Sequence, residues 1–223
     1  MLVELISGPE LGKTQLCLHV ACASAASGDT VRGCSAVRGE QLGVLAAKPA
    51  LDATLLTPPP RTPTQVLYMD AHGGCVGARI MTLLEGHTAD VEAAARRISV
   101  ATVTDVFQAF HILDEHRQLL AVRRDAMGDM ASETPPAAFR GGVVILDSVG
   151  ALVSPILGGS QVRGHALMMT LASELKRLAQ EYQAAVLVTN SYLGGRNGPA
   201  KPGLGASWLA APHVRLDLAA LFA

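Results

Sequence analysis

Short, continuous apolar runs alternate along the chain with longer stretches in which apolar residues recur every three or four positions. Continuous apolar runs are typical of strands that are buried on both faces of a parallel sheet. Buried strands of this kind are predicted at 2–6, 143–146 and 185–188, and further strands at 66–69, 98–103 and 214–218. Each run ends near a glycine, proline or polar residue, which favours a turn at that point.

The stretches between these runs predict helices. The clearest covers 163–182, where large apolar residues recur at spacings of four and three, as one buried helix face requires. Those residues are Leu167, Leu171, Leu175, Leu178 and Tyr182. Further helices are predicted at 14–26, 76–84, 88–97 and after Asp105, which can cap a helix with Gln108 three residues on. Strands that alternate with helices favour an α/β fold whose largely parallel central sheet is flanked by helices.

Residues 30–64 interrupt this alternation. They contain five prolines and little periodicity, and they are long for a connection between a helix and a strand. We therefore predict an irregular, exposed insertion, and a lineage-specific binding loop is the alternative. Loops are also predicted at 124–141 and 193–205, which are rich in glycine and proline.

The strongest chemical signal directly follows the first predicted strand. It reads Ser7, Gly8, Pro9, Glu10, Leu11, Gly12, Lys13, Thr14 and Gln15. Strand, glycine-containing loop and helix in this order are typical of a P-loop, in which backbone N–H groups at a helix N-terminus surround a phosphate chain. Lys13 is predicted to reach the β- and γ-phosphates of ATP, and Thr14 to bind Mg²⁺ through its hydroxyl. The first motif position, usually glycine, is Ser7.

A P-loop predicts a second, acidic motif, and the run 142–147 supplies it. A buried strand that ends in Asp147 would place this carboxylate beside the phosphates, where it can orient the hydrated Mg²⁺. The alternative is an ordinary solvated aspartate at the end of a strand. Together the two motifs predict ATP and Mg²⁺ as cofactors.

Composition narrows the class of protein. With 49% hydrophobic and 17% charged residues the chain is globular, and its net charge of −1 confines any nucleic-acid contact to a local patch. The cysteines form no CxxC pair and have no histidine cluster beside them, so reduced thiols are expected rather than a zinc site or a disulfide framework. They are Cys17, Cys22, Cys34 and Cys75. No apolar stretch is long enough to span a membrane, and we expect an intracellular protein with no membrane partner.

Several longer stretches resemble the RecA/Rad recombinase family. GPELGKTQLC, VLYMD, VVILDS and AAVLVTN occur in the order found in these proteins. Residues 153–180 and 201–208 look like the D-type eukaryotic recombinase paralogue in particular. The resemblance covers nearly the whole chain except 30–64. It implies a RecA-like P-loop NTPase core over 1–223, without the small N-terminal helical domain that the paralogue carries before its P-loop strand.

The resemblance also implies roles for single residues. Arg79 stands where the recombinases place a side chain that stacks on adenine, although an ordinary solvated arginine is the alternative. Residues 154–163 and 193–205 match the two DNA-facing loops of the family. Arg163, Arg196 and Lys201 are then candidates for contacts with DNA phosphates, and solvated surface charges are again the alternative.

The sequence departs from the active recombinases at two catalytic positions. Their water-activating glutamate after the second strand is replaced by His72, and their γ-phosphate-sensing amide is missing because Ser191 follows Asn190. His72 is the only local candidate for a general base, and a loop histidine without a role is the alternative. Loss of a general base costs about 10²–10⁴ in rate. We therefore expect ATP binding with weak hydrolysis.

Three functions fit these features. The first is an ATP-binding assembly or adaptor subunit in homologous-recombination DNA repair. The resemblance implies that it acts in the nucleus with other recombinase paralogues and contacts single-stranded or branched DNA. The second is a fully active DNA-dependent ATPase and strand-exchange protein that uses His72. The third, a small-molecule kinase, would need an arginine-rich lid, and 193–205 holds only Arg196 and Lys201.

Overall fold

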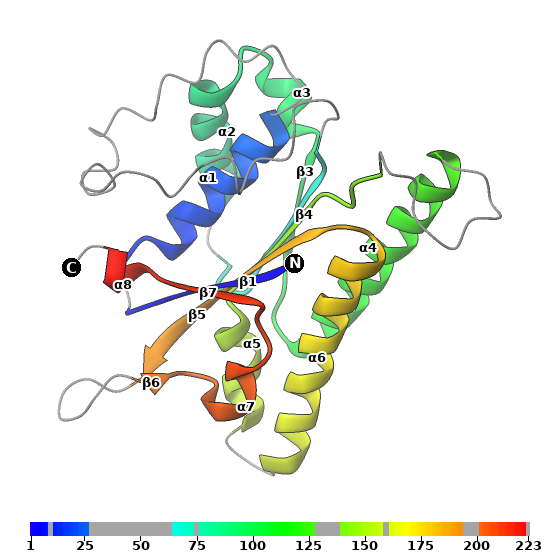
Figure 1. Ribbon diagram of the computed structural model, residues 1–223. Helices are drawn as coiled ribbons and strands as arrows, with labels where there is room; N and C mark the ends of the chain where they lie inside the picture. Colours follow the sequence, from blue (N-terminus) through cyan, green and yellow to red (C-terminus); the bar gives the residue numbers. More distant parts are fainter. Residues whose placement is uncertain are drawn as a thin grey trace.

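The computed structural model describes residues 1–8, 11–26, 64–73, 76–127, 139–157, 161–193 and 201–221. Within these ranges one twisted sheet runs through the molecule and helices lie on both of its faces (Figure 1). The α/β class with a largely parallel sheet is therefore confirmed. The predicted insertion at 30–64 lies, apart from residue 64, outside the described residues, and its character stays a prediction.

Six strands of the sheet run parallel, in the order β3-β2-β4-β5-β1-β7. They are β1 (Leu2–Ser7), β2 (Val66–Asp70), β3 (Ile98–Thr102), β4 (Val143–Asp147), β5 (Ala185–Leu193) and β7 (Val214–Asp217). The short strand β6 (Lys201–Pro202) pairs antiparallel with the end of β5. The runs predicted from the sequence all appear as strands. β1, β2 and β4 are buried at every position, whereas the edge strands β3 and β7 are partly exposed.

The helices divide between the two faces of the sheet (Figure 1). One face carries α1 (Lys13–Ala26), α2 (Val76–His87) and α3 (Val91–Ala95), and the other carries α4 (Val106–Met127), α5 (Val149–Leu157), α6 (Gln161–Glu181) and α7 (Gly205–Leu209). The short α8 (Leu218–Leu221) follows β7. None of the described helices is both long and apolar enough to cross a membrane.

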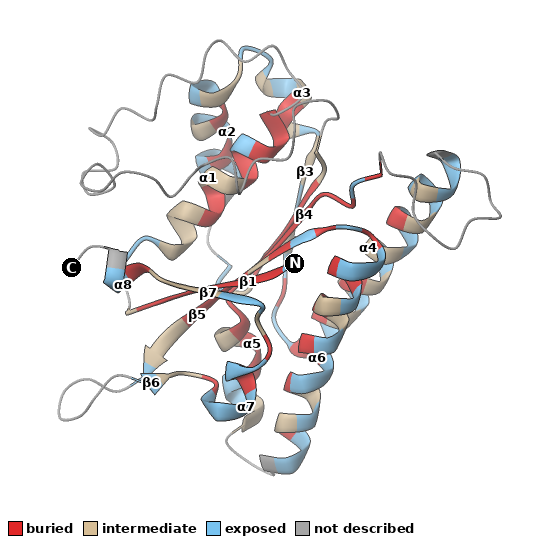
Figure 2. Ribbon diagram, viewed as in Figure 1, coloured by how far each residue is buried: buried red, intermediate tan, exposed pale blue. Residues whose placement is uncertain are grey.

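Side chains along each central strand point alternately to the two faces of the sheet, so successive residues pack into the hydrophobic cores on opposite faces. In β2, Val66 and Tyr68 pack with α1, α2 and α3, whereas Leu67 and Met69 pack with α4, α5 and α6. Figure 2 shows the result: the central strands β1, β2 and β4 and the inner helix faces are buried, whereas exposed residues lie on the outer helix faces and on the edge strands β3 and β7. This packing fixes which side chains emerge at the ends of the strands.

The helix predicted after Asp105 is present and longer than expected. The Asp105 carboxylate accepts the backbone N–H groups of Phe107 and Gln108 at 2.8 and 2.9 Å, which confirms the predicted cap. The helix then continues to Met127, so the predicted loop at 124–141 was wrong in its first residues. The Arg124 guanidinium lies 5.6 Å from the centre of the ring of Tyr182, which directly follows α6, so this last turn has a partner there.

Three further elements replace predicted loops or strand residues. Helix α5 includes Pro155 and covers the start of the segment 154–163, because its apolar residues find a buried site under the sheet. The segment 193–205 contains β6. The last strand ends at Asp217 rather than 218, because the Asp217 carboxylate accepts the N–H of Ala219 at 3.0 Å and turns the chain into α8.

Candidate nucleotide site

The carboxyl ends of the central strands meet at one edge of the sheet. Ser7 lies opposite Ser191 in the pairing of β1 with β5, and Asp70 lies opposite Asp147 in the pairing of β2 with β4. In open parallel α/β sheets, ligands bind in the crevice beyond this edge. The predicted phosphate loop follows β1 and the predicted Mg²⁺ carboxylate ends β4, so both lie at this edge with β5 between their strands.

The predicted P-loop begins at the end of β1 and leads directly into α1. Gly12 has a φ of +77°, a backbone conformation that residues other than glycine rarely adopt. The helix begins at the next residue, Lys13. The first turn of α1 contains no acidic residue, so the positive end of the helix dipole has no carboxylate of its own. Pro9 and Glu10 lie outside the described residues.

The Lys13 side chain folds back over this loop. Its ammonium donates hydrogen bonds to the carbonyl oxygens of Ser7 and Gly8 at 3.2 and 2.8 Å, and to the Ser7 hydroxyl at 3.0 Å. Burial lowers the pKa of Lys13, and the nearby Asp147 carboxylate opposes this fall. Lys13 and Asp147 therefore face a shared region at the edge of the sheet, and Ser7, in the usual glycine position, helps to hold the ammonium.

The Asp147 carboxylate is buried and held from both sides. One oxygen accepts the Tyr68 hydroxyl of β2 at 2.9 Å, and the other accepts the Thr189 hydroxyl of β5 at 2.5 Å. Burial and the charge of Asp147 raise the pKa of Tyr68, which keeps its phenol a hydrogen-bond donor. A carboxylate fixed in this way is suited to orient a metal-bound water, because the hydrogen bonds that it accepts set the position of its oxygen atoms.

Sequence reasoning missed Tyr68 and Thr189. A weak signal was available, because a tyrosine in a buried, otherwise apolar strand must find a partner for its hydroxyl. The identity of that partner depends on the lateral order of the strands, which places β2 and β5 on either side of β4.

The structure holds the backbone of His72 more firmly than its side chain. The buried Asp70 carboxylate accepts the N–H groups of His72 and Gly73 at 2.9 and 3.1 Å, which fixes the turn after β2. The His72 side chain is exposed at this turn. Its role as a general base therefore stays a prediction.

Arg79 and Gln15, both predicted to contact the nucleotide, lie together. The exposed Arg79 guanidinium reaches from α2 to the first turn of α1 and donates to the Gln15 side-chain oxygen at 2.5 Å. Thr14 is the neighbour of Gln15 in that turn. Arg79, the candidate contact with adenine, thus lies next to the candidate contacts with the phosphates and the metal ion.

The candidate DNA contacts occupy separate elements. Arg163 is exposed near the start of α6, and Lys201 is exposed on β6. Arg196 lies outside the described residues. The first predicted DNA loop, 154–163, is not a loop over its whole length. Residues 154–157 belong to α5 and 161–163 belong to α6. Residues 158–160, between the two helices, lie outside the described residues.

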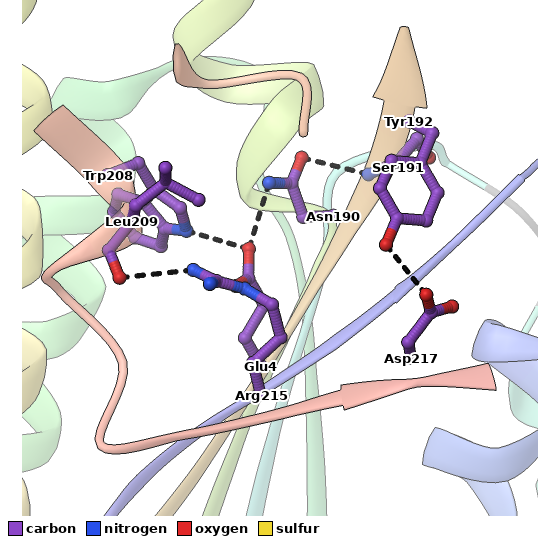
Figure 3. A network of polar contacts seen from close by, with 8 residues as sticks. All are labelled: Glu4, Asn190, Ser191, Tyr192, Trp208, Leu209, Arg215 and Asp217. Carbon is purple, nitrogen blue, oxygen red and sulfur yellow. Dashed lines mark hydrogen bonds and ion pairs between the residues drawn. The ribbon is translucent and has the colours of Figure 1, made fainter. Parts of the chain in front are cut away.

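A buried ionic network lies beside this edge of the sheet (Figure 3). Glu4 is fully buried in β1, and one of its oxygens accepts the Asn190 amide and the Trp208 indole at 2.9 and 2.8 Å. Its other oxygen accepts the Arg215 guanidinium at 2.5 Å. Asn190 also accepts the N–H of Ser191 at 2.8 Å. The network fastens α7, which follows the second candidate DNA loop, to the strand that leads into the P-loop.

No group of three or more histidine, cysteine, aspartate or glutamate side chains in the described ranges is arranged to hold a metal ion. Cys17 and Cys22 are buried free thiols, whereas Cys34 and Cys75 lie outside those ranges. Burial raises the pKa of the Cys22 thiol to about 11, which leaves it protonated and unreactive at neutral pH.

The parallel sheet, the loop before α1 and the buried acid at the end of β4 define an α/β domain with a RecA-like core. No protein-family model matches the chain. The chain is 36% identical over 219 residues to DNA repair protein RAD51 homolog 4 of Bos taurus. This alignment covers 96% of this chain and 54% of the Bos taurus protein. The chain belongs to the RecA/Rad51 family, as the paralogue resemblance in its sequence predicted.

Two further relatives carry the same description. The Mus musculus protein is 34% identical over 216 residues, covering 96% of this chain and 53% of its own. A probable RAD51 homolog 4 of Dictyostelium discoideum is 39% identical over 74 residues, covering 33% of this chain and 21% of its own. The chain spans about half the length of the mammalian relatives.

Proposed function

We propose that this chain binds ATP with Mg²⁺ and serves homologous-recombination DNA repair as an assembly subunit. The observation that carries the proposal is the placement of Lys13 over the loop after β1, within electrostatic reach of an Asp147 carboxylate that two hydroxyl groups hold in place. An ammonium, a helix N-terminus and a fixed carboxylate at one sheet edge suit a triphosphate and its metal ion.

Each predicted residue has a part in this proposal. The backbone from Gly8 to Gln15, including Pro9, Glu10, Leu11 and Gly12, surrounds the phosphates, and Lys13 neutralises the β- and γ-phosphates. Thr14 binds Mg²⁺ directly, and Asp147 orients a water of its hydration shell. Arg79 stacks on adenine through the face of its guanidinium.

Hydrolysis by this site is proposed to be weak. His72 replaces the carboxylate base of the active recombinases, and Ser191 replaces their phosphate-sensing amide. The His72 side chain is exposed, and a neutral imidazole lacks the charge of the carboxylate that it replaces. ATP then serves chiefly to hold the protein in a binding-competent form.

The proposed partners are other recombinase paralogues, together with single-stranded or branched DNA in the nucleus. RecA-type domains place ATP at the contact between neighbouring subunits, so the nucleotide can act as a clamp. Arg163, Arg196 and Lys201 are the proposed contacts with DNA phosphates. The near-neutral net charge of −1 makes these contacts local and dependent on salt.

Binding of a recombinase paralogue is expected to strengthen when ATP and Mg²⁺ are added, because the nucleotide contributes to the contact. The measurement is a quantitative pull-down of a tagged paralogue with and without ATP, using wild type and Lys13→Ala. The substituted chain should lose the gain caused by ATP and keep the weaker, nucleotide-free binding. Equal recovery under all four conditions would contradict the clamp.

A further inference from the structure

Hydrogen bonds between side chains connect α2 to the first turns of α1. The Arg79 guanidinium donates to the Gln15 oxygen at 2.5 Å, and the Gln15 amide nitrogen lies 3.2 Å from Nε2 of His19, one helical turn further on. The His87 ring of α2 meets the His19 ring edge-on, with 5.8 Å between ring centres and an angle of 72°. Arg79 is thus the end of a chain that begins at a partly buried histidine.

The chemistry of these groups fixes the direction of the chain. A guanidinium only donates hydrogen bonds, so the Gln15 atom that faces Arg79 is the carbonyl oxygen. The Gln15 atom that faces His19 is then the amide nitrogen, which also only donates. His19 must therefore accept through Nε2, and its proton resides on Nδ1. Neutral His19 completes the chain.

We propose that Gln15 and His19 are positioning residues that orient the Arg79 guanidinium for adenine. The inference rests on the proposed ATP site and adds to it the origin of base recognition. An exposed arginine side chain samples many rotamers, and stacking on a base requires one plane. A guanidinium that is already held has less conformational entropy to lose when the base arrives.

The proposal has a consequence for pH. Burial lowers the pKa of His19 below its usual 6.5. The pKa of His87 is lowered mainly by burial and, to a smaller extent, by the charge of His19. The groups on α2 that face this end of the chain are His87 and, through Gln15, Arg79. Protonated His19 would turn an N–H towards the N–H of Gln15. The hydrogen bonds from His19 through Gln15 to Arg79 are therefore intact near neutral pH and are lost as the pH falls through the lowered pKa of His19.

Calorimetric affinities for Mg·ATP and for base-free Mg·tripolyphosphate separate orientation of the base from phosphate binding. In Gln15→Met, which keeps the length of the side chain without its hydrogen bonds, the ratio of the ATP affinity to the tripolyphosphate affinity should fall about fivefold at neutral pH. Arg79→Gln should lower the same ratio at least as far. Equal losses for both ligands would mean that Gln15 acts on the phosphates, and would overturn the inference.

The pH profile provides a second readout that a purely structural role would not move. The wild-type ratio should fall as the pH is lowered from neutral through the depressed pKa of His19, whereas His19→Leu should show a low ratio on both sides of this transition. His111→Gln, which changes an exposed histidine of α4, should titrate like wild type. Gln15→Glu keeps an acceptor for Arg79 and accepts from protonated His19, so its ratio should not fall in acid.

The outcomes distinguish this inference from the proposed function. A wild-type chain that binds neither ligand would remove the proposed ATP site and the inference with it. A chain that binds both ligands, with a ratio insensitive to Gln15→Met and to acid, would leave the ATP site in place and overturn the positioning role alone.

Discussion

Replacement of Lys13 by alanine is expected to weaken Mg·ATP binding about a hundredfold, or ~3 kcal/mol. The Lys13 ammonium is partly buried, and its present acceptors are two carbonyl oxygens and a hydroxyl of the loop. Phosphate oxygens would be stronger acceptors, because both partners of the hydrogen bond would then be charged. Equilibrium titration with a fluorescent ATP analogue measures the loss.

Lys176→Ala is the matched control. Lys176 lies on α6 and donates to the carbonyl oxygen of Ala210 at 3.3 Å in an exposed position, so its removal takes away the same charge without touching the loop. Wild-type affinity is expected for this variant. A Lys13→Ala chain that stays folded and binds within about twofold of wild type, a difference of ~0.4 kcal/mol, would contradict the phosphate role of Lys13.

Replacement of Arg215 by leucine is expected to lower the free energy of unfolding by about 3 kcal/mol. Arg215 is the charged partner of Glu4, which lies in β1 and is 0% exposed. Without it, the donors that the carboxylate keeps among the described residues are the neutral groups of Asn190 and Trp208. Urea unfolding measures the change, and Trp208, the only tryptophan in the chain, reports it by fluorescence from inside the network.

The control for this prediction is Arg96→Leu. The Arg96–Glu92 pair has the same 2.5 Å separation, but its side chains are 77% and 78% exposed. An exposed pair contributes about 0–1 kcal/mol, because water screens it. Similar losses in both variants would show that burial of Glu4 is not what makes its ion pair important.

The sequence predicted the framework well because the framework depends on local patterns. An apolar run such as 143–146 can be satisfied only by burial on both faces, and the structure places it in the centre of the sheet. The spacing of leucines in 163–182 predicted α6 nearly to its ends. The Ser7–Thr14 motif and Asp147 were found for the same reason, since each lies where a predicted strand ends.

The errors arose where burial overrides local preference. The family resemblance placed a DNA-facing loop at 154–163, but Val149, Leu152 and Val153 are buried against the sheet, and helix α5 continues to Leu157. In the same way, contact with Tyr182 extends α4 beyond the predicted start of a loop at 124. A single sequence shows the preference but not the surface that opposes it.

The supporting residues of the site could not be predicted because their partners are distant in the chain. Glu4 and Trp208 are 204 positions apart, and Thr189 and Asp147 are 42 apart. A charged residue in an apolar run, as Glu4 is, signals that a partner must exist. Only the strand order β4-β5-β1-β7 reveals which residue it is.

The central claim is that Lys13, the start of α1 and Asp147 jointly hold a triphosphate and its metal ion. A crystal structure with a non-hydrolysable ATP analogue and Mn²⁺ tests it most directly, because anomalous scattering locates the metal without reference to the protein. We predict a metal peak beside the Thr14 hydroxyl, with Asp147 hydrogen-bonded to a metal-bound water and Lys13 on the β- and γ-phosphates. An analogue bound away from the loop between β1 and α1, or a metal remote from Thr14 and Asp147, would contradict the account.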